Sequence, residues 1–222
     1  ASCLCTHVNE EAIDAAHLQA KAVQLLLRQD VSQQVAAYKA QQQQQQEKDS
    51  QNEQQAAAMQ SQQEPFDCVA LVKQLLKFSR CPAMQKHIQT VLEAYEQGWS
   101  DAKVQETLIQ PNQFGKNFQI KAIDAFATCL FSFLKYWQDP EECIIRTACL
   151  GGDADTTACI VGALCGSLHG AKWIPSRWYD KIENTPDVGR DALEQVAKEL
   201  VTLDLKTNDD IINDKPKEKP AK

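Results

Sequence analysis

The stretch that decides the fold is residues 150–170, which read LGGDADTTACIVGALCGSLHG. Two adjacent glycines allow the backbone to turn sharply, and the apolar residues after them recur at helical spacing. The stretch therefore predicts a tight turn that leads into a helix over residues 155–170. Gly162, Gly166 and Gly170 recur every fourth residue in this segment. Because a glycine inside a helix costs about 1 kcal/mol, we expect this face to pack closely against another helix.

The turn contains the candidate metal-binding residues. Asp153, Asp155 and Thr156 place three hard oxygen ligands within four residues, and Mg2+ prefers such ligands. Asp155 also falls near the start of the next helix, whose positive end favours an ionised carboxylate. One aspartate that caps the helix would explain either Asp153 or Asp155, but not both. The spacing therefore leaves metal binding and helix capping open.

A phosphatase with an aspartyl-phosphate intermediate offers a rival interpretation, since its nucleophile loop has the pattern Asp-x-Asp-x-Thr. Here Thr157 occupies the last position of that pattern, and residues 144–150 could form the buried strand that such a loop must follow. However, no alternation of strands and helices surrounds the segment. The sequence therefore favours the metal turn over the phosphatase loop.

The rest of the chain is predicted to be largely helical. Helical periodicity covers residues 10–28, 66–79, 83–97, 100–109, 119–137, 140–150, 175–183 and 189–203. Asn9 and Ser100 are candidate N-caps, and no segment shows the alternation of a strand. The predicted fold class is therefore all-α. We divide the chain into a helical part of the catalytic domain (1–31), a Gln-rich low-complexity insertion (32–64), the remainder of the catalytic domain (65–207) and a disordered tail (208–222).

Composition narrows the functional classes. The chain has 222 residues, 43% of them hydrophobic, and a net charge of −7, which argues against direct binding of nucleic acid. No apolar stretch reaches the ~18–20 residues that cross a bilayer, so we expect no membrane association. The nine cysteines form no CxxC pair, and they indicate free thiols in a reducing, intracellular setting. Most fall in apolar runs, where burial is expected: Cys129, Cys143, Cys149, Cys159 and Cys165.

Three parts of the chain resemble a known family. Residues 150–170 and the continuation 174–178 resemble the C-terminal signature of the ADP-ribosylglycohydrolase family, which reads Gly-Gly-Asp-x-Asp-Thr, then a Gly-Ala-x-x-Gly helix and a Pro-x-x-Trp element. Residues 5–8 (Cys-Thr-His-Val) and the Ala-rich segment 15–23 resemble the Thr-His segment and helix of that family. Within the family, the chain is most similar to the serine-directed branch that cleaves poly(ADP-ribose). Residues 120–134 resemble the helix before the signature in that branch.

The resemblance implies a compact all-α domain that holds two Mg2+ ions in a cleft and hydrolyses the glycosidic bond of ADP-ribose attached to protein. It implies that Asp153, Asp155 and Thr156 bind metal. It also implies that His7 contacts the ligand and that Ile120 lines the adenosine side of the cleft, although the glycines usual beside Ile120 are absent here. The implied partners are ADP-ribosylated proteins or poly(ADP-ribose). The implied setting is a monomer in the cytoplasm, nucleus or mitochondrial matrix that takes part in the DNA damage response.

The chain departs from the family in its N-terminal motifs. The family's Gly-Asp-x-x-Gly segment, its Thr-Asp-Asp-Thr cluster and its phosphate-binding Gly/Ser loop have no counterpart in the sequence, which opens on Ala1. We therefore expect a fragment that holds about half of the dimetal site, lacks the general acid, and is inactive and unstable by itself. The alternative is a non-catalytic relative that binds ADP-ribose or serves a structural role on the same fold.

Overall fold

The computed structural model describes residues 7–32, 34–40, 66–108, 119, 121–185 and 188–202. All regular elements in these ranges are helices, apart from an isolated antiparallel bridge between Asn184 and Gly189. The all-α prediction is therefore confirmed for the described residues. The chain divides into two units, Ala1–Trp173 and Ile174–Lys222. The Gln-rich segment after residue 40 and the predicted disordered tail lie outside the described residues.

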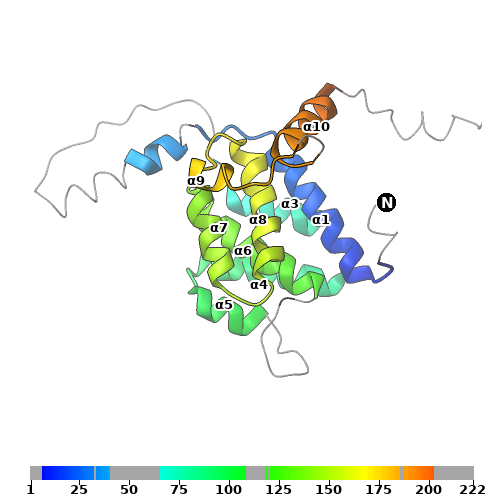
Figure 1. Cartoon of the computed structure of the whole chain (residues 1–222). Helices are drawn as coiled ribbons and strands as arrows, with labels where there is room; N and C mark the ends of the chain where they lie inside the picture. Colours follow the sequence, from blue (N-terminus) through cyan, green and yellow to red (C-terminus); the bar gives the residue numbers. More distant parts are fainter. Residues whose placement is uncertain are drawn as a thin grey trace, which may run out of the picture. The chain divides into compact units, whose positions relative to one another are not determined.

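The helices of the first unit lie close to the predicted ranges (Figure 1). They are α1 (Glu10–Leu26), α3 (Cys68–Phe78), α4 (Pro82–Glu96), α5 (Asp101–Leu108), α6 (Ala122–Tyr136), α7 (Pro140–Cys149) and α8 (Ala154–His169). The largest difference is at α6, which begins at Ala122 rather than at residue 119. Gln119 lies ahead of the helix, where its side-chain oxygen accepts a hydrogen bond from the backbone N–H of Asp153.

Local sequence explains where these helices begin. The Asn9 side chain accepts a hydrogen bond from the backbone N–H of Glu11 at 2.9 Å, and the Ser100 hydroxyl oxygen accepts one from Lys103 at 3.3 Å. Both predicted N-caps are therefore confirmed. Pro140 stands in the first turn of α7, where its missing N–H leaves no hydrogen bond unmade.

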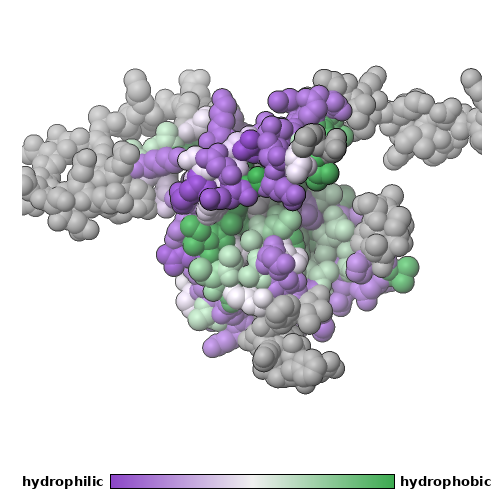
Figure 2. Space-filling view, viewed as in Figure 1, coloured by the Kyte–Doolittle hydropathy of each residue, from purple (hydrophilic) through white to green (hydrophobic). Residues whose placement is uncertain are grey.

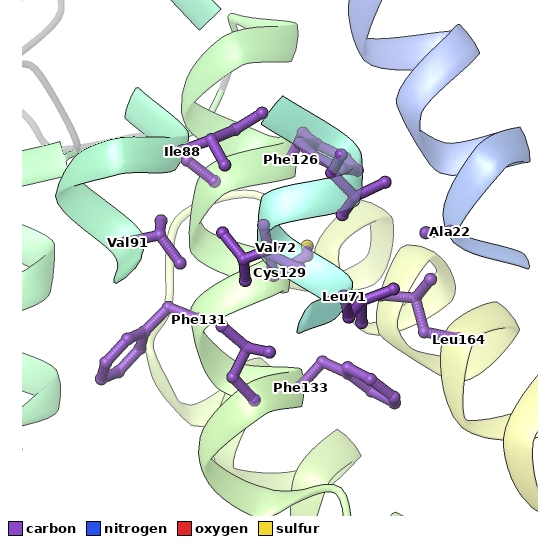
Figure 3. Close-up of a cluster of buried hydrophobic side chains, with 14 of the residues drawn as sticks. Ala22, Leu71, Val72, Ile88, Val91, Phe126, Cys129, Phe131, Phe133 and Leu164 are labelled. Carbon is purple, nitrogen blue, oxygen red and sulfur yellow. The ribbon is translucent and has the colours of Figure 1, made fainter. Parts of the chain in front are cut away.

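Helix α6 lies at the centre of the core of the first unit. Every residue from Ile123 to Leu134 is buried, and the helix contacts α1, α4, α5, α7 and α8. A helix that is buried on all sides must be enclosed by its neighbours. Apolar side chains from five helices meet in this core, as Figure 3 shows: Ala22 of α1, Leu71 and Val72 of α3, Ile88 and Val91 of α4, Phe126 and Phe133 of α6, and Leu164 of α8.

The glycine face of α8 does not pack as predicted. A Cβ added at Gly162 would lie 3.6 Å from the Ile144 side chain of α7, which is an ordinary contact distance. One added at Gly166 would meet no described atom within 4 Å, and Gly170 is the C-cap of α8. The predicted close-packed ridge is therefore wrong for the described part of the chain, because α8 buries another face: Thr157, Val161, Leu164, Cys165 and Leu168. The surface over α7 and α8 is mostly hydrophobic, as the green and pale green residues in Figure 2 show.

The second unit contains α9 (Ser176–Tyr179) and α10 (Arg190–Thr202). The Tyr179 hydroxyl donates a hydrogen bond to the Glu194 carboxylate, and the Arg190 guanidinium lies 4.4 Å from the centroid of the Tyr179 ring. These two contacts link α9 to α10 within the unit. Three apolar side chains of α10 are exposed: Leu193, Val196 and Leu200.

All cysteines in the described ranges are free thiols. The predicted burial is confirmed for Cys129, Cys143 and Cys165, and Cys68 and Cys81 are buried as well. Cys149 and Cys159 are exposed, so the prediction of burial is wrong for these two, which lie on outer faces of α7 and α8. Within the described residues, no helix combines the length and the apolar character needed to cross a bilayer.

Candidate active site

A Gly-Gly turn joins α7 to α8. Helix α7 ends at Cys149, and Gly151 and Gly152 follow with φ angles of 77° and 72°, a left-handed region that favours glycine. Asp153 then occupies the N-cap position of α8. Because residues 140–149 form a helix rather than a strand, the phosphatase interpretation is wrong.

Asp153 does not cap α8 with its side chain. No capping hydrogen bond to its carboxylate is present, although its backbone stands at the N-cap. The hydroxyl of Thr157, a residue only 1% exposed, instead donates to the backbone oxygen of Asp153 at 3.0 Å and so fixes the first turn of the helix. Helix capping therefore does not account for the Asp153 carboxylate.

Asp155 lies on the exposed side of the first turn of α8. Its pKa is held below the usual value, first by the side chain of Asp153 and then by the backbone N–H groups of Thr156 and of Asp155 itself. The side chains of Asp153 and Asp155 therefore influence each other at the start of α8.

The chemistry of this turn fits Mg2+ in part. Asp153, Asp155 and Thr156 offer hard oxygen ligands, which Mg2+ takes in octahedral geometry. Within the described residues, no group of three or more His, Cys, Asp or Glu side chains is placed to hold a metal ion. The turn can therefore supply part of a coordination shell, and the other ligands would be water or groups outside the described residues.

A pocket of about 350 Å3 opens between α1, α6 and α8 beside this turn. Its walls are mostly apolar, and the apolar lining residues are Ala12, Ala15, Ala16, Ala122, Ala125, Phe126 and Ile160. The polar lining residues are His7, Gln19, Gln119, Asp153 and Thr156. The pocket brings His7 together with Asp153 and Thr156, which lie more than a hundred residues further along the sequence. Asp155 does not line the pocket, and the predicted adenosine-side residue Ile120 lies outside the described residues.

Two glutamines hold the Gly-Gly turn, and sequence reasoning missed both. Gln119 is 2% exposed, and its side-chain oxygen accepts the backbone N–H of Asp153 at 3.0 Å. On the other side, the side-chain amide of Gln105 donates to the backbone oxygen of Leu150. A single glutamine outside a motif does not indicate its hydrogen-bond partner in the sequence. These two contacts therefore could not be predicted before the three-dimensional arrangement of the helices was known.

A third glutamine offers an unused hydrogen-bond acceptor at the pocket. The Gln19 side-chain nitrogen donates to the backbone oxygen of Ile160 at 3.2 Å, which ties α1 to α8. Its side-chain oxygen is buried and has no hydrogen-bond partner among the described residues. A buried acceptor without a partner costs about 1–3 kcal/mol, so a donor from a ligand would relieve this cost.

A comparison with known proteins assigns this all-α chain to a family. The model of a family described as ADP-ribosylglycohydrolase matches residues 1–210, and the chain belongs to this family. Among curated relatives, ADP-ribosyl-dinitrogen reductase glycohydrolase of Rhodospirillum rubrum is 44% identical over 43 residues, which are 19% of this chain and 15% of that protein. ADP-ribosylhydrolase ARH3 of Bos taurus is 26% identical over 125 residues, covering 45% of this chain and 34% of the relative.

An uncharacterised protein of Archaeoglobus fulgidus is also similar, with 33% identity over 89 residues, which are 39% of this chain and 26% of that protein. The chain thus spans no more than about a third of the length of these relatives. Family membership is therefore established over most of this chain, whereas the aligned stretches of the relatives leave most of their own length unmatched.

Proposed function

We propose that this chain forms part of a magnesium-dependent hydrolase that removes ADP-ribose from proteins by cleaving its glycosidic bond. The substrates would be ADP-ribose linked to serine, or poly(ADP-ribose). The observation that carries the proposal is the pocket that brings His7 of the N-terminal segment beside Asp153 and Thr156 of the Gly-Gly turn. Membership of the ADP-ribosylglycohydrolase family supports the same reaction.

Each group of pocket residues would have a distinct task. Asp153, Asp155 and Thr156 would hold Mg2+, which supplies positive charge that orients the ribose hydroxyls and stabilises developing negative charge. His7 would contact the ADP-ribose, and the unpaired Gln19 oxygen would accept a hydrogen bond from one of its hydroxyl or amino groups. The apolar alanine-rich wall would pack against uncharged faces of the ligand and exclude water.

Cleavage of a glycosidic bond also needs a proton for the leaving group and stabilisation of an oxocarbenium-like transition state. Asp153 is the one carboxylate that lines the pocket in the described part of the chain, and its proposed task is metal binding. We therefore assign the general acid to a residue outside the described ranges. The described residues would bind ADP-ribose, and turnover would depend on that acid.

A non-catalytic relative that binds ADP-ribose remains the second candidate. It would use the same pocket, in which Asp153 is the one carboxylate among the described residues. Both candidates require that the pocket bind ADP-ribose. They differ in whether the complete natural polypeptide hydrolyses the glycosidic bond.

The first experiment is calorimetric titration of ADP-ribose into the 222-residue chain with Mg2+ present. We expect saturable binding that His7→Ala weakens and that His17→Ala leaves unchanged, because His17 lies on α1 away from this pocket. Absence of binding by the unmodified chain would overturn both candidates. Release of ADP-ribose from serine-modified peptides or poly(ADP-ribose) by the complete polypeptide, abolished by EDTA, would support the hydrolase, and binding without release would support the non-catalytic relative.

A further inference from the structure

Gln119 makes a buried contact with the backbone of the Gly-Gly turn. Its side-chain oxygen lies 3.0 Å from the backbone nitrogen of Asp153, and the residue is 2% exposed. The bond spans 34 residues of sequence and joins the segment before α6 to the start of α8. The bond is partly buried, and it restricts the backbone that it holds.

Gly152 provides the space for this contact. A Cβ built on Gly152 would overlap the Gln119 side-chain oxygen, which is the atom that binds Asp153. A Cβ built on Gly151 would meet no described atom within 4 Å. The second glycine of the turn is therefore needed for two reasons, its φ of 72° and the approach of the Gln119 carboxamide.

We propose that Gln119 is a positioning residue, which holds the backbone of Asp153 and thereby fixes the direction in which the Asp153 carboxylate faces the pocket. This inference rests on the proposed function, because Asp153 is a proposed cation ligand. The side chain of Asp153 makes no capping bond to α8, so its backbone N–H is the place where the surroundings can fix its orientation. Gln119 supplies this restraint without adding a third negative charge beside the two aspartates.

Groups that orient metal ligands without touching the metal contribute strongly to affinity. Loss of such a partner typically weakens metal binding by about 10–100-fold. Gln119 acts on the backbone of a ligand residue rather than on its carboxylate, so its loss would widen the range of positions that Asp153 adopts. We expect the effect at the lower end of this range.

The test uses the 15N-labelled 222-residue chain and three variants. Gln119→Leu removes the acceptor, and Gln119→Glu keeps one. Gln85→Leu is the matched control, because the Gln85 side-chain amide donates a partly buried hydrogen bond to the backbone oxygen of Ser79 at 2.8 Å, outside the pocket. The readouts are hydrogen exchange of the Asp153 amide, affinity for Mn2+ as a spectroscopic substitute for Mg2+, and the thermal midpoint.

We expect Gln119→Leu to speed exchange of the Asp153 amide and to raise the Mn2+ dissociation constant about tenfold. Gln119→Glu should keep the amide protected, and Gln85→Leu should lower the thermal midpoint while changing neither site readout. Unchanged protection of the Asp153 amide, or equal Mn2+ affinity, in Gln119→Leu would overturn the proposal alone. No Mn2+ uptake by the unmodified chain would overturn the proposed function and with it this proposal.

Discussion

The carboxylate of Asp14 on α1 accepts a 2.6 Å hydrogen bond from the hydroxyl of Ser79, which directly follows α3. Asp14 is 3% exposed and also accepts the backbone N–H groups of Arg80 at 3.0 Å and Cys81 at 3.3 Å. Three donors thus converge on one buried carboxylate and fix the α3–α4 connection against α1. The same helix presents Ala12, Ala15 and Gln19 to the pocket, so this contact holds one wall of the candidate site.

Asp14→Ala should lower the free energy of unfolding by about 3 kcal/mol, because it leaves buried donors without an acceptor. Urea unfolding monitored by circular dichroism measures the change. Asp67→Ala is the control, since Asp67 caps α3 at an exposed position and should cost about 1 kcal/mol. Equal losses in the two variants would show that Asp14 acts as an ordinary surface carboxylate.

His87 should make stability depend on pH. Its Nε2 lies 3.5 Å from the buried carboxylate of Asp124, and this contact, followed by the backbone oxygen of Ala83 and the charge of Glu11, raises the pKa of His87 above 6.5. A raised pKa in the folded state stabilises the protein below the unfolded-state pKa, and this stabilisation is lost as the pH rises through the folded-state value.

We therefore expect His87→Gln to destabilise the chain more at about pH 5.5 than at about pH 8, measured by urea unfolding at both values. Asp124→Asn should reduce this pH dependence, because it removes the carboxylate that raises the His87 pKa. The idea fails if His87→Gln costs the same at both pH values.

The two glycines of the turn should differ in their tolerance of a side chain. Gly151→Ala should lower the free energy of unfolding by about 1 kcal/mol, because the added methyl group introduces backbone strain but no steric overlap. Gly152→Ala should lower it by about 2 kcal/mol, because the added methyl group also displaces the Gln119 side-chain oxygen from its hydrogen bond. Thermal unfolding of both variants, repeated in a Gln119→Ala background, checks the assignment. The difference between the glycines should shrink in that background, and a difference that persists would contradict the steric explanation.

Gln19 should affect ligand binding more than stability. We expect Gln19→Met to change the free energy of unfolding by about 1 kcal/mol or less, because it removes an unpaired acceptor along with the bond to Ile160. Its dissociation constant for ADP-ribose should rise about tenfold, as for the loss of one good hydrogen bond. Gln24→Met on the exposed side of α1 is the matched control. Equal affinities of the two variants for ADP-ribose in calorimetry would refute a ligand role for Gln19.

The sequence predicted the helices and the turn well, because both depend on local patterns. The periodic apolar residues of α1, α4 and α6 carry their own signal, and the Gly-Gly-Asp pattern needs no partner to predict a turn. The roles of Gln119 and Gln19 could not be predicted, because their bonds join residues 34 and 141 positions apart. The glycine face of α8 was predicted wrongly, because spacing alone does not tell which face a helix buries.

Calorimetric titration of Mg2+ into the chain tests the central claim most directly. The unmodified chain should bind the ion, and the double variant Asp153→Ala/Asp155→Ala should lose this binding. A control that removes two charges elsewhere, Asp67→Asn/Glu93→Gln, should keep it, because Asp67 lies at the start of α3 and Glu93 on α4, outside the turn. Mg2+ affinity that survives unchanged in Asp153→Ala/Asp155→Ala would contradict the assignment of the Gly-Gly turn as a metal site.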